Sequence, residues 1–129
     1  MENDIFHLND IKTLVDSFYD KVREDALLAP IFNRVIKDRW PEHLKIMYTF
    51  WQTVLLGEHT YLGSPFPPHA KLPVTKLHFD RWLELFFITI HENFEGEKAE
   101  EAKCRASKMA EIFQFKIERH QQTVSRPLI

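Results

Sequence analysis

The chain has 129 residues, of which 44% are hydrophobic and 13% aromatic, and this composition predicts one domain spanning residues 1–129. A formal net charge of −2 is not that of a typical nucleic-acid-binding protein, which carries a large excess of basic residues. The longest apolar run is too short to cross a bilayer, and the acidic amino terminus does not resemble a signal peptide. We therefore expect a soluble cytoplasmic protein that binds neither nucleic acid nor membrane.

Helical periodicity dominates the first half of the chain. A helix predicted to start at the cap Asn9 and to end before Pro30 carries apolar residues at the spacing of one helix face. That face consists of Ile11, Leu14, Val15, Phe18, Tyr19 and Val22. A short element at 31–33 follows, and a further helix is predicted between the cap Asp38 and the stop signal Gly57.

The second half begins with a turn-rich stretch. Residues 58–74 hold four of the seven prolines and predict a loop or a short frayed helix. Thr75 then opens a strongly apolar helix that should end near Phe94. After Gly96, small and apolar residues at helical spacing predict a long final helix that can approach its neighbour closely. The fold class expected is all-α.

One histidine stands out because it lies in the proline-rich loop between apolar helices. An imidazole on such a loop suits a single axial bond to the iron of a flat, mostly apolar cofactor, and His69 is our candidate. Tyr19, His43 and Trp82, on three different helices, offer polar tips for a small ligand on the opposite face. The alternatives are that His69 is a surface residue, that the aromatics are ordinary core residues, and that His78 is the axial ligand.

Two other classes of protein stay open on the residues alone. His91 and Glu95 have the four-residue spacing of a di-iron helix bundle, although the other helices lack matching pairs. A cofactor-free interaction module, whose aromatic groove binds a partner helix, is the second alternative. The only cysteine, Cys104, lies on a polar stretch and excludes disulfides and cysteine-rich metal sites.

Several sequence runs together resemble the truncated haemoglobins, most closely their third group. The runs are FYDKVR (18–23), LAPIF (28–32), WPEH (40–43) continuing to FW (50–51), LLG (55–57), HAKLP (69–73) and HFDRWL (78–83). The absence of paired glycines also fits the third group. The resemblance implies a 2-on-2 helical sandwich around one haem b, the truncated globin fold.

The resemblance also implies roles for individual residues. His69 matches the proximal ligand, which forms the only protein bond to iron, and Tyr19, Trp82 and His43 match distal residues that face the bound ligand. His43 either swings into the pocket as a gate or rotates outward to solvent. Trp82 also belongs to the haem wall. The other expected wall residues are Phe18, Met47, Phe50, Trp51 and Phe79, with Phe18 and Met47 on the distal side.

The function implied is binding of O2 and other small ligands, namely NO, CO or peroxide, at ferrous iron. A polar cage of phenol, indole and imidazole should hold oxygen strongly, because its donors respond to charge on the ligand. Slow release suits oxygen chemistry or NO detoxification better than oxygen delivery. A nitric oxide dioxygenase or a peroxidase-like activity would need an electron-donating reductase as partner, and the sequence assigns no catalytic residue.

Overall fold

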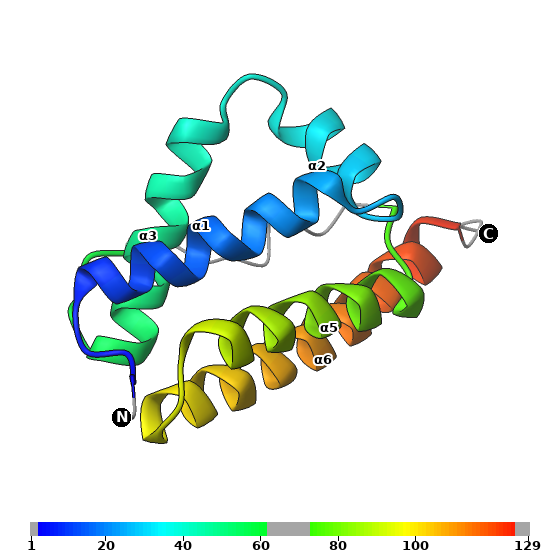
Figure 1. Ribbon diagram of the computed structural model, residues 1–129. Helices are drawn as coiled ribbons and strands as arrows, with labels where there is room; N and C mark the ends of the chain where they lie inside the picture. Colours follow the sequence, from blue (N-terminus) through cyan, green and yellow to red (C-terminus); the bar gives the residue numbers. More distant parts are fainter. Residues whose placement is uncertain (1–2, 62–72, 126–129) are drawn as a thin grey trace.

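The computed structural model describes residues 3–61 and 73–125, with side chains described to residue 121, and in this part of the chain every regular element is an α-helix. The helices are α1 (Leu8–Glu24), α2 (Ala29–Ile36), α3 (Trp40–Leu56), α5 (Lys76–Asn93) and α6 (Glu97–Ser125). Helices α5 and α6 lie side by side as one layer (Figure 1). Helices α1 and α3 cross each other on one side of this pair and form the other layer. The all-α prediction is confirmed. Within the described ranges, no helix is long and apolar enough to cross a membrane.

Helix α1 begins slightly earlier than predicted. The carboxylate of Asp10 accepts hydrogen bonds from the backbone N–H groups of Phe6 and His7, at 3.0 and 3.1 Å. Because this side chain reaches back to the residues before the helix, it makes His7 the cap in place of Asn9. The predicted apolar face of α1 is buried along its whole length. This face forms the centre of the core and packs on α3 and α5.

The α2–α3 region departs most from the prediction. The element expected at 31–33 is an eight-residue helix with Pro30 in its first turn, where a missing N–H donor costs nothing. Arg39 occupies the N-cap position of α3 and makes no side-chain capping hydrogen bond there, so the prediction that Asp38 is the cap is wrong. Its other end agrees with the prediction, since Gly57 takes the left-handed conformation with φ of 69°.

The bounds of α5 and α6 agree closely with those predicted from the sequence. Thr75 caps α5, and its backbone N–H donates to Nδ1 of His78 at 3.0 Å. Helix α5 ends at Asn93, next to the predicted end near Phe94, and α6 follows Gly96. Small side chains of α6 are buried, which lets the two helices of this layer pack closely. These are Ala99, Ala102, Ala106 and Ala110.

The segment before α1 is hydrogen-bonded to the start of α6. The buried carboxylate of Asp4 accepts hydrogen bonds from the backbone N–H groups of Lys98 and Ala99, at 2.9 and 2.8 Å, in the first turn of α6. Gly96 has φ of 139°, and a Cβ there would lie 2.6 Å from the Asp4 carboxylate. A glycine is therefore required both by the backbone conformation and by the close approach of Asp4.

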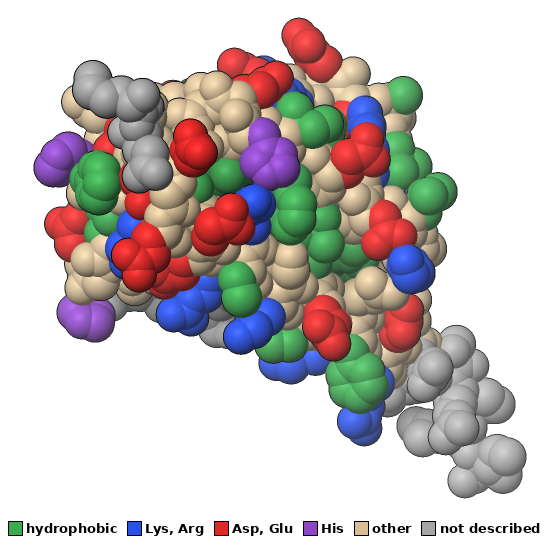
Figure 2. All heavy atoms as spheres, turned by 60° about the horizontal axis from the view of Figure 1, so that its bottom comes forward, with side chains coloured by type: hydrophobic (Ala, Val, Ile, Leu, Met, Phe, Trp, Pro, Cys, Tyr) green, Lys and Arg blue, Asp and Glu red, His purple; other side chains and the backbone are tan. Residues whose placement is uncertain are grey.

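The outer face of the α5–α6 layer carries mixed charges. Figure 2 shows acidic and basic side chains interspersed over the face seen from below, with apolar side chains between them. On α6, Lys98 pairs with Glu101 at 3.1 Å and Lys103 pairs with Glu100 at 3.0 Å. Opposite charges on this face thus neutralise one another locally.

Candidate functional site

An apolar cavity of about 220 Å³ lies between the two helical layers. Its walls come from α1, α2, α3, α5 and α6, together with residues just before α2 and α5. Seven of the residues predicted to form the site line it, and these are Tyr19, His43, Met47, Phe50, Trp51, Phe79 and Trp82. The fold thus brings together side chains that are up to 63 positions apart in the sequence, from Tyr19 to Trp82.

Tyr19 is held on the buried face of α1. Its side chain is 5% exposed, and burial raises the pKa of its phenol far above the usual value. The hydroxyl is therefore a neutral donor at physiological pH. Its ring meets that of His43 edge-on, with centroids 5.1 Å apart.

His43 lies one turn into α3 and contributes to the cavity wall. Its ring is edge-on to Trp40 as well as to Tyr19, with a centroid distance of 5.6 Å to the indole. Trp40 itself lies 5.8 Å from Tyr19 between ring centroids. Three rings from α1 and α3 therefore contact one another, and this contact places the imidazole at the cavity.

Trp82 on α5 belongs to a second aromatic group. Its indole stacks on Phe86 at an interplanar angle of 11° and a centroid distance of 5.6 Å, and Trp51 also stacks on Phe86. Phe18 meets Trp82 edge-on at 5.2 Å. Phe18 is not part of the cavity lining in the described structure, contrary to the expected wall position, and at 2% exposure it supports Trp82 and Tyr19 from behind.

The α3 wall of the cavity carries the remaining predicted residues. Phe50 meets Trp51 and Tyr61 edge-on, with centroid distances of 5.3 Å to each. Met47 lies one helical turn before Trp51 and, like Phe50, is half-buried. Phe79 completes the lining from α5. These side chains give the cavity a mostly aromatic and apolar surface.

The two candidates for the axial ligand differ in what the structure shows of them. His69 falls within residues 62–72, outside the described residues, so its role stays a prediction. His78 lines the cavity, but its Nδ1 accepts the hydrogen bond from the backbone of Thr75. His78 therefore lies in the first turn of α5, and one of its ring nitrogens is used in the helix cap.

Part of the cavity wall was missed by the sequence analysis. Residues of α2 and the turn before it line one side, and residues of α6 line another. These are Leu28, Ile31, Phe32, Val35 and Ile36 at α2, and Met109, Ala110, Phe113 and Ile117 on α6. The apolar stripe of α6 was the available signal, although periodicity alone does not separate helix packing from cavity lining.

An ion pair closes the corner between α1, α2 and α5 beside Trp82. Arg81 donates from Nε to the buried carboxylate of Asp25 at 2.6 Å, and the backbone N–H groups of Leu27 and Leu28 donate to the same carboxylate at 3.1 and 3.0 Å. Burial acts to raise the pKa of Asp25, but Arg81 and the backbone donors outweigh it and hold the pKa below its ordinary value. The corner is therefore fixed by a charged carboxylate.

The chemistry of the cavity lining suits a flat, mostly apolar cofactor of the haem type. Haem needs an apolar and aromatic slot with a few polar groups placed on its faces. The described lining supplies this slot, and its polar tips are the phenol of Tyr19, the indole of Trp82 and the imidazoles of His43 and His78. The side chains that line the cavity therefore match the chemical requirements of haem.

The structure contradicts the di-iron alternative. Helix α5 ends at Asn93, so Glu95 lies beyond the helix and shares no helix face with His91. Nε2 of His91 instead lies 3.1 Å from Nζ of Lys103. Within residues 3–61 and 73–125, no group of three or more metal-ligating side chains lies close together.

Comparisons with known proteins agree with the geometry. The family model described as "Bacterial-like globin" matches residues 5–118. The group 3 truncated hemoglobin ctb of Campylobacter jejuni is 35% identical over 118 residues, which cover 88% of this chain and 93% of the relative. The crystal structure of the group III truncated hemoglobin from Campylobacter jejuni matches with a TM-score of 0.83 at 34% identity, covering 91% of this chain and 95% of that chain.

Proposed function

The chain belongs to the bacterial-like globin family, as a haem-binding truncated haemoglobin of the third group, and from this premise we propose that it holds haem b and binds O2 at ferrous iron. The observation that carries the proposal is the aromatic cavity between the layers, in which Tyr19, His43 and Trp82 come together. Bound haem would supply the iron centre that takes a diatomic ligand. Because the family binds haem, we interpret the aromatic cavity as a haem site and not as the partner-binding groove of a cofactor-free interaction module.

We assign the proximal role to His69, as the resemblance implies, and the distal role to residues of α1, α3 and α5. The phenol of Tyr19 stays protonated because it is buried, and the indole of Trp82 is always a donor. Both donate more strongly as negative charge develops on the ligand. His43, in contact with the Tyr19 ring, is the third polar group and the candidate gate.

The apolar side chains have a separate task. Met47, Phe50, Trp51 and Phe79 hold the flat cofactor by contact and exclude water from its faces. Water exclusion lowers the local dielectric and strengthens the hydrogen bonds of the distal donors. The wall and the polar tips therefore act together on the bound ligand.

The polar cage favours retention over delivery. Each hydrogen bond to a charged acceptor contributes about 1.5–3 kcal/mol, which slows ligand release by roughly one to two orders of magnitude. The same site would take NO, CO or peroxide. Oxygen chemistry such as NO detoxification or a peroxidase-like reaction is consistent with slow release, and it requires an electron-donating reductase.

Ligand release tests the distal assignment. We expect O2 to leave Tyr19→Phe and Trp82→Phe about 10–100-fold faster than the wild type in stopped-flow experiments, with haem content unchanged. Tyr48→Phe is the matched control, because Tyr48 donates to Asp16 and is not part of the described cavity lining. Unchanged release in both distal variants would contradict the polar cage.

A further inference from the structure

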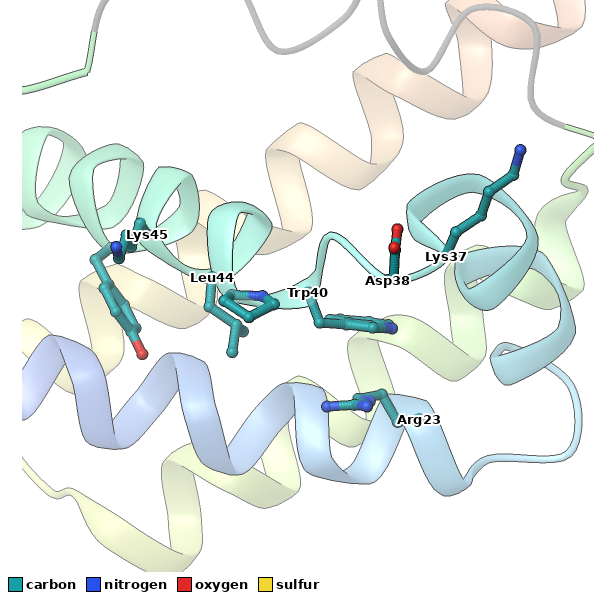
Figure 3. Close-up of a pocket in the computed structure, with 8 residues that line it drawn as sticks. Arg23, Lys37, Asp38, Trp40, Leu44 and Lys45 are labelled. Atoms are coloured by element: carbon teal, nitrogen blue, oxygen red, sulfur yellow. The ribbon is translucent and has the colours of Figure 1, made fainter.

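A second hollow lies on the outer side of α1 and α3, away from the cavity. This groove has a volume of about 520 Å³ and is lined by Arg23 of α1, by Lys37 and Asp38 before α3, and by Trp40 and Lys45 of α3 (Figure 3). Leu44, Pro41 and Tyr48 complete its lining. The proposed haem site uses none of these side chains.

The groove is positively charged on a molecule that is negative as a whole. Arg23, Lys37 and Lys45 face one carboxylate of the lining, that of Asp38, whereas the chain has a formal net charge of −2. Among the described residues, ion pairs link cations of α1, α5 and α6 to acidic neighbours, and none of them includes these three cations. The groove therefore keeps a local excess of positive charge.

The cations are spread along the groove and do not converge on one point. Figure 3 shows Lys37 and Lys45 at opposite ends, with Arg23 and Trp40 between them. Such a row does not close around a small anion, which needs donors aimed at one place. It matches instead an extended segment carrying several carboxylates.

Trp40 connects the groove to the cavity. On the groove side, the guanidinium of Arg23 lies 4.6 Å from the centroid of the Trp40 ring. The indole N–H donates to the side-chain oxygen of Asn33 in α2 at 3.2 Å, which fixes the ring. Trp40 also meets the rings of Tyr19 and His43, which line the cavity.

We propose that the groove docks an acidic segment of a partner protein and that docking acts on the cavity through Trp40. A carboxylate that pairs with Arg23 competes with the indole for the guanidinium, and any change in the Trp40 ring reaches His43 and Tyr19 by direct contact. The docking step stands on the groove alone. Its effect on a bound ligand rests on the proposed function.

A labelled ten-residue glutamate peptide tests the docking step by fluorescence anisotropy on the haem-loaded protein. Because the whole protein repels an acidic peptide, binding reports the local charge of the groove. Lys37→Glu and Lys45→Glu should each weaken binding about tenfold, and binding should weaken steeply between roughly 0.05 and 0.5 M salt. The matched control is Lys108→Glu, an exposed charge on α6, which should leave the affinity within about twofold.

Two results would overturn the docking proposal. One is equal loss of peptide affinity in Lys108→Glu and Lys45→Glu, which would show only a general charge effect. The other is displacement of the peptide by inorganic phosphate at constant ionic strength, which would show a small-anion site. Haem uptake is measured on the same samples by absorbance, so failure of the proposed function is distinguished from failure of docking.

The link through Trp40 has its own readout. In nitrogen–proton NMR spectra of the ferrous CO form, the indole signal of Trp40 should move during the peptide titration. The midpoint of this movement should equal the midpoint of the anisotropy titration. The indole of Trp51, which is buried and not in the groove, is the internal control and should not move. Peptide binding that leaves the Trp40 signal unchanged would contradict the link.

Discussion

The cavity and the groove lie on opposite sides of the same two helices, α1 and α3, and differ in kind. The cavity is walled by apolar and aromatic side chains with a few polar tips, whereas the groove holds three cations and one carboxylate. Trp40 lines the groove and contacts Tyr19 and His43 of the cavity. An amphipathic helix pair can thus hold a cofactor on one side and keep a charged surface on the other, with one residue common to both.

Removing the common residue should have the largest effect on stability. Trp40→Ala deletes an indole that is 5% exposed, and we expect the free energy of unfolding to fall by about 3–5 kcal/mol in urea denaturation. Trp40→Phe is the control, because it keeps an aromatic ring. It loses the hydrogen bond to Asn33, at about 0.5–1.5 kcal/mol, and part of the buried ring volume, so its loss of stability should be smaller than that of Trp40→Ala. A loss below about 1 kcal/mol in Trp40→Ala would show that the two hollows are not joined by packing.

The corner beside Trp82 tests how firmly the cavity frame is held. Asp25→Ala removes the acceptor of two backbone donors and of Arg81, and should lower the free energy of unfolding at neutral pH by about 1–3 kcal/mol. The ion-pair share is reduced by solvent, because the Arg81 side chain is 37% exposed. Asp80→Ala breaks an exposed pair with Lys76 and should cost about 0.5 kcal/mol or less.

The ion pair between Asp25 and Arg81 predicts that the stability of the fold depends on pH. The pKa of Asp25 in the folded protein lies below the ordinary aspartate value of 3.8, so the stabilising contribution of this carboxylate is complete above that value and is lost as the pH falls below it. Wild type and Asp25→Ala should therefore differ by a constant amount near neutrality and converge below about pH 4. A difference that grows on acidification would contradict the assignment of a charged carboxylate.

On the groove side, the predicted effect on stability is smaller. Arg23→Met keeps much of the aliphatic stem and removes the cation over the Trp40 ring, for a loss of about 0.5–1 kcal/mol in the same denaturation experiment. Lys37→Met serves as the control, since no ring contact is shown for Lys37, and should change stability little. Equal losses in both variants would mean that the contact of Arg23 with the indole does not stabilise the fold.

The smallest effect is expected at Tyr48, at the edge of the groove. Its hydroxyl donates to Asp16 at 2.5 Å, and burial together with that carboxylate raises its pKa to about 12. Since the protonated form is favoured in the fold, the contribution is present below pH 10 and is lost as the pH rises through 12. Ultraviolet titration of wild type against Tyr48→Phe should show one tyrosine fewer ionising near 12, and Tyr48→Phe should cost about 0.5 kcal/mol.

The helices could be predicted where local signals decide them. Thr75 and Gly57 are caps whose conformation follows from residue type, and the apolar periodicity of α1 identified its buried face. The start of α1 was misplaced because Asp10 reaches backward to cap the helix. The element predicted at 31–33 was too short because Pro30 lies in the first turn of α2 and does not stand before it. These errors arise where one side chain determines a helix end.

The candidate site was predictable only in part. Tyr19, His43 and Trp82 were singled out by their polar tips on three helices, and the family resemblance gave them their distal roles. The structure places all three on the cavity. The walls from α2 and α6 depend on how distant helices pack, which local periodicity does not encode. The groove was missed because Arg23 and Lys45 look like ordinary surface charges until the fold places them in one hollow.

The most direct test of the central claim is a visible absorption spectrum of the purified protein after haem reconstitution. Spectra of the ferric, ferrous and ferrous CO forms are compared between the wild type and His69→Ala. We predict a sharp Soret band that moves with CO in the wild type, and a weaker or altered band in the variant. Failure of the wild type to take up stoichiometric haem would contradict haem binding, and an unchanged spectrum of His69→Ala would contradict the proximal assignment.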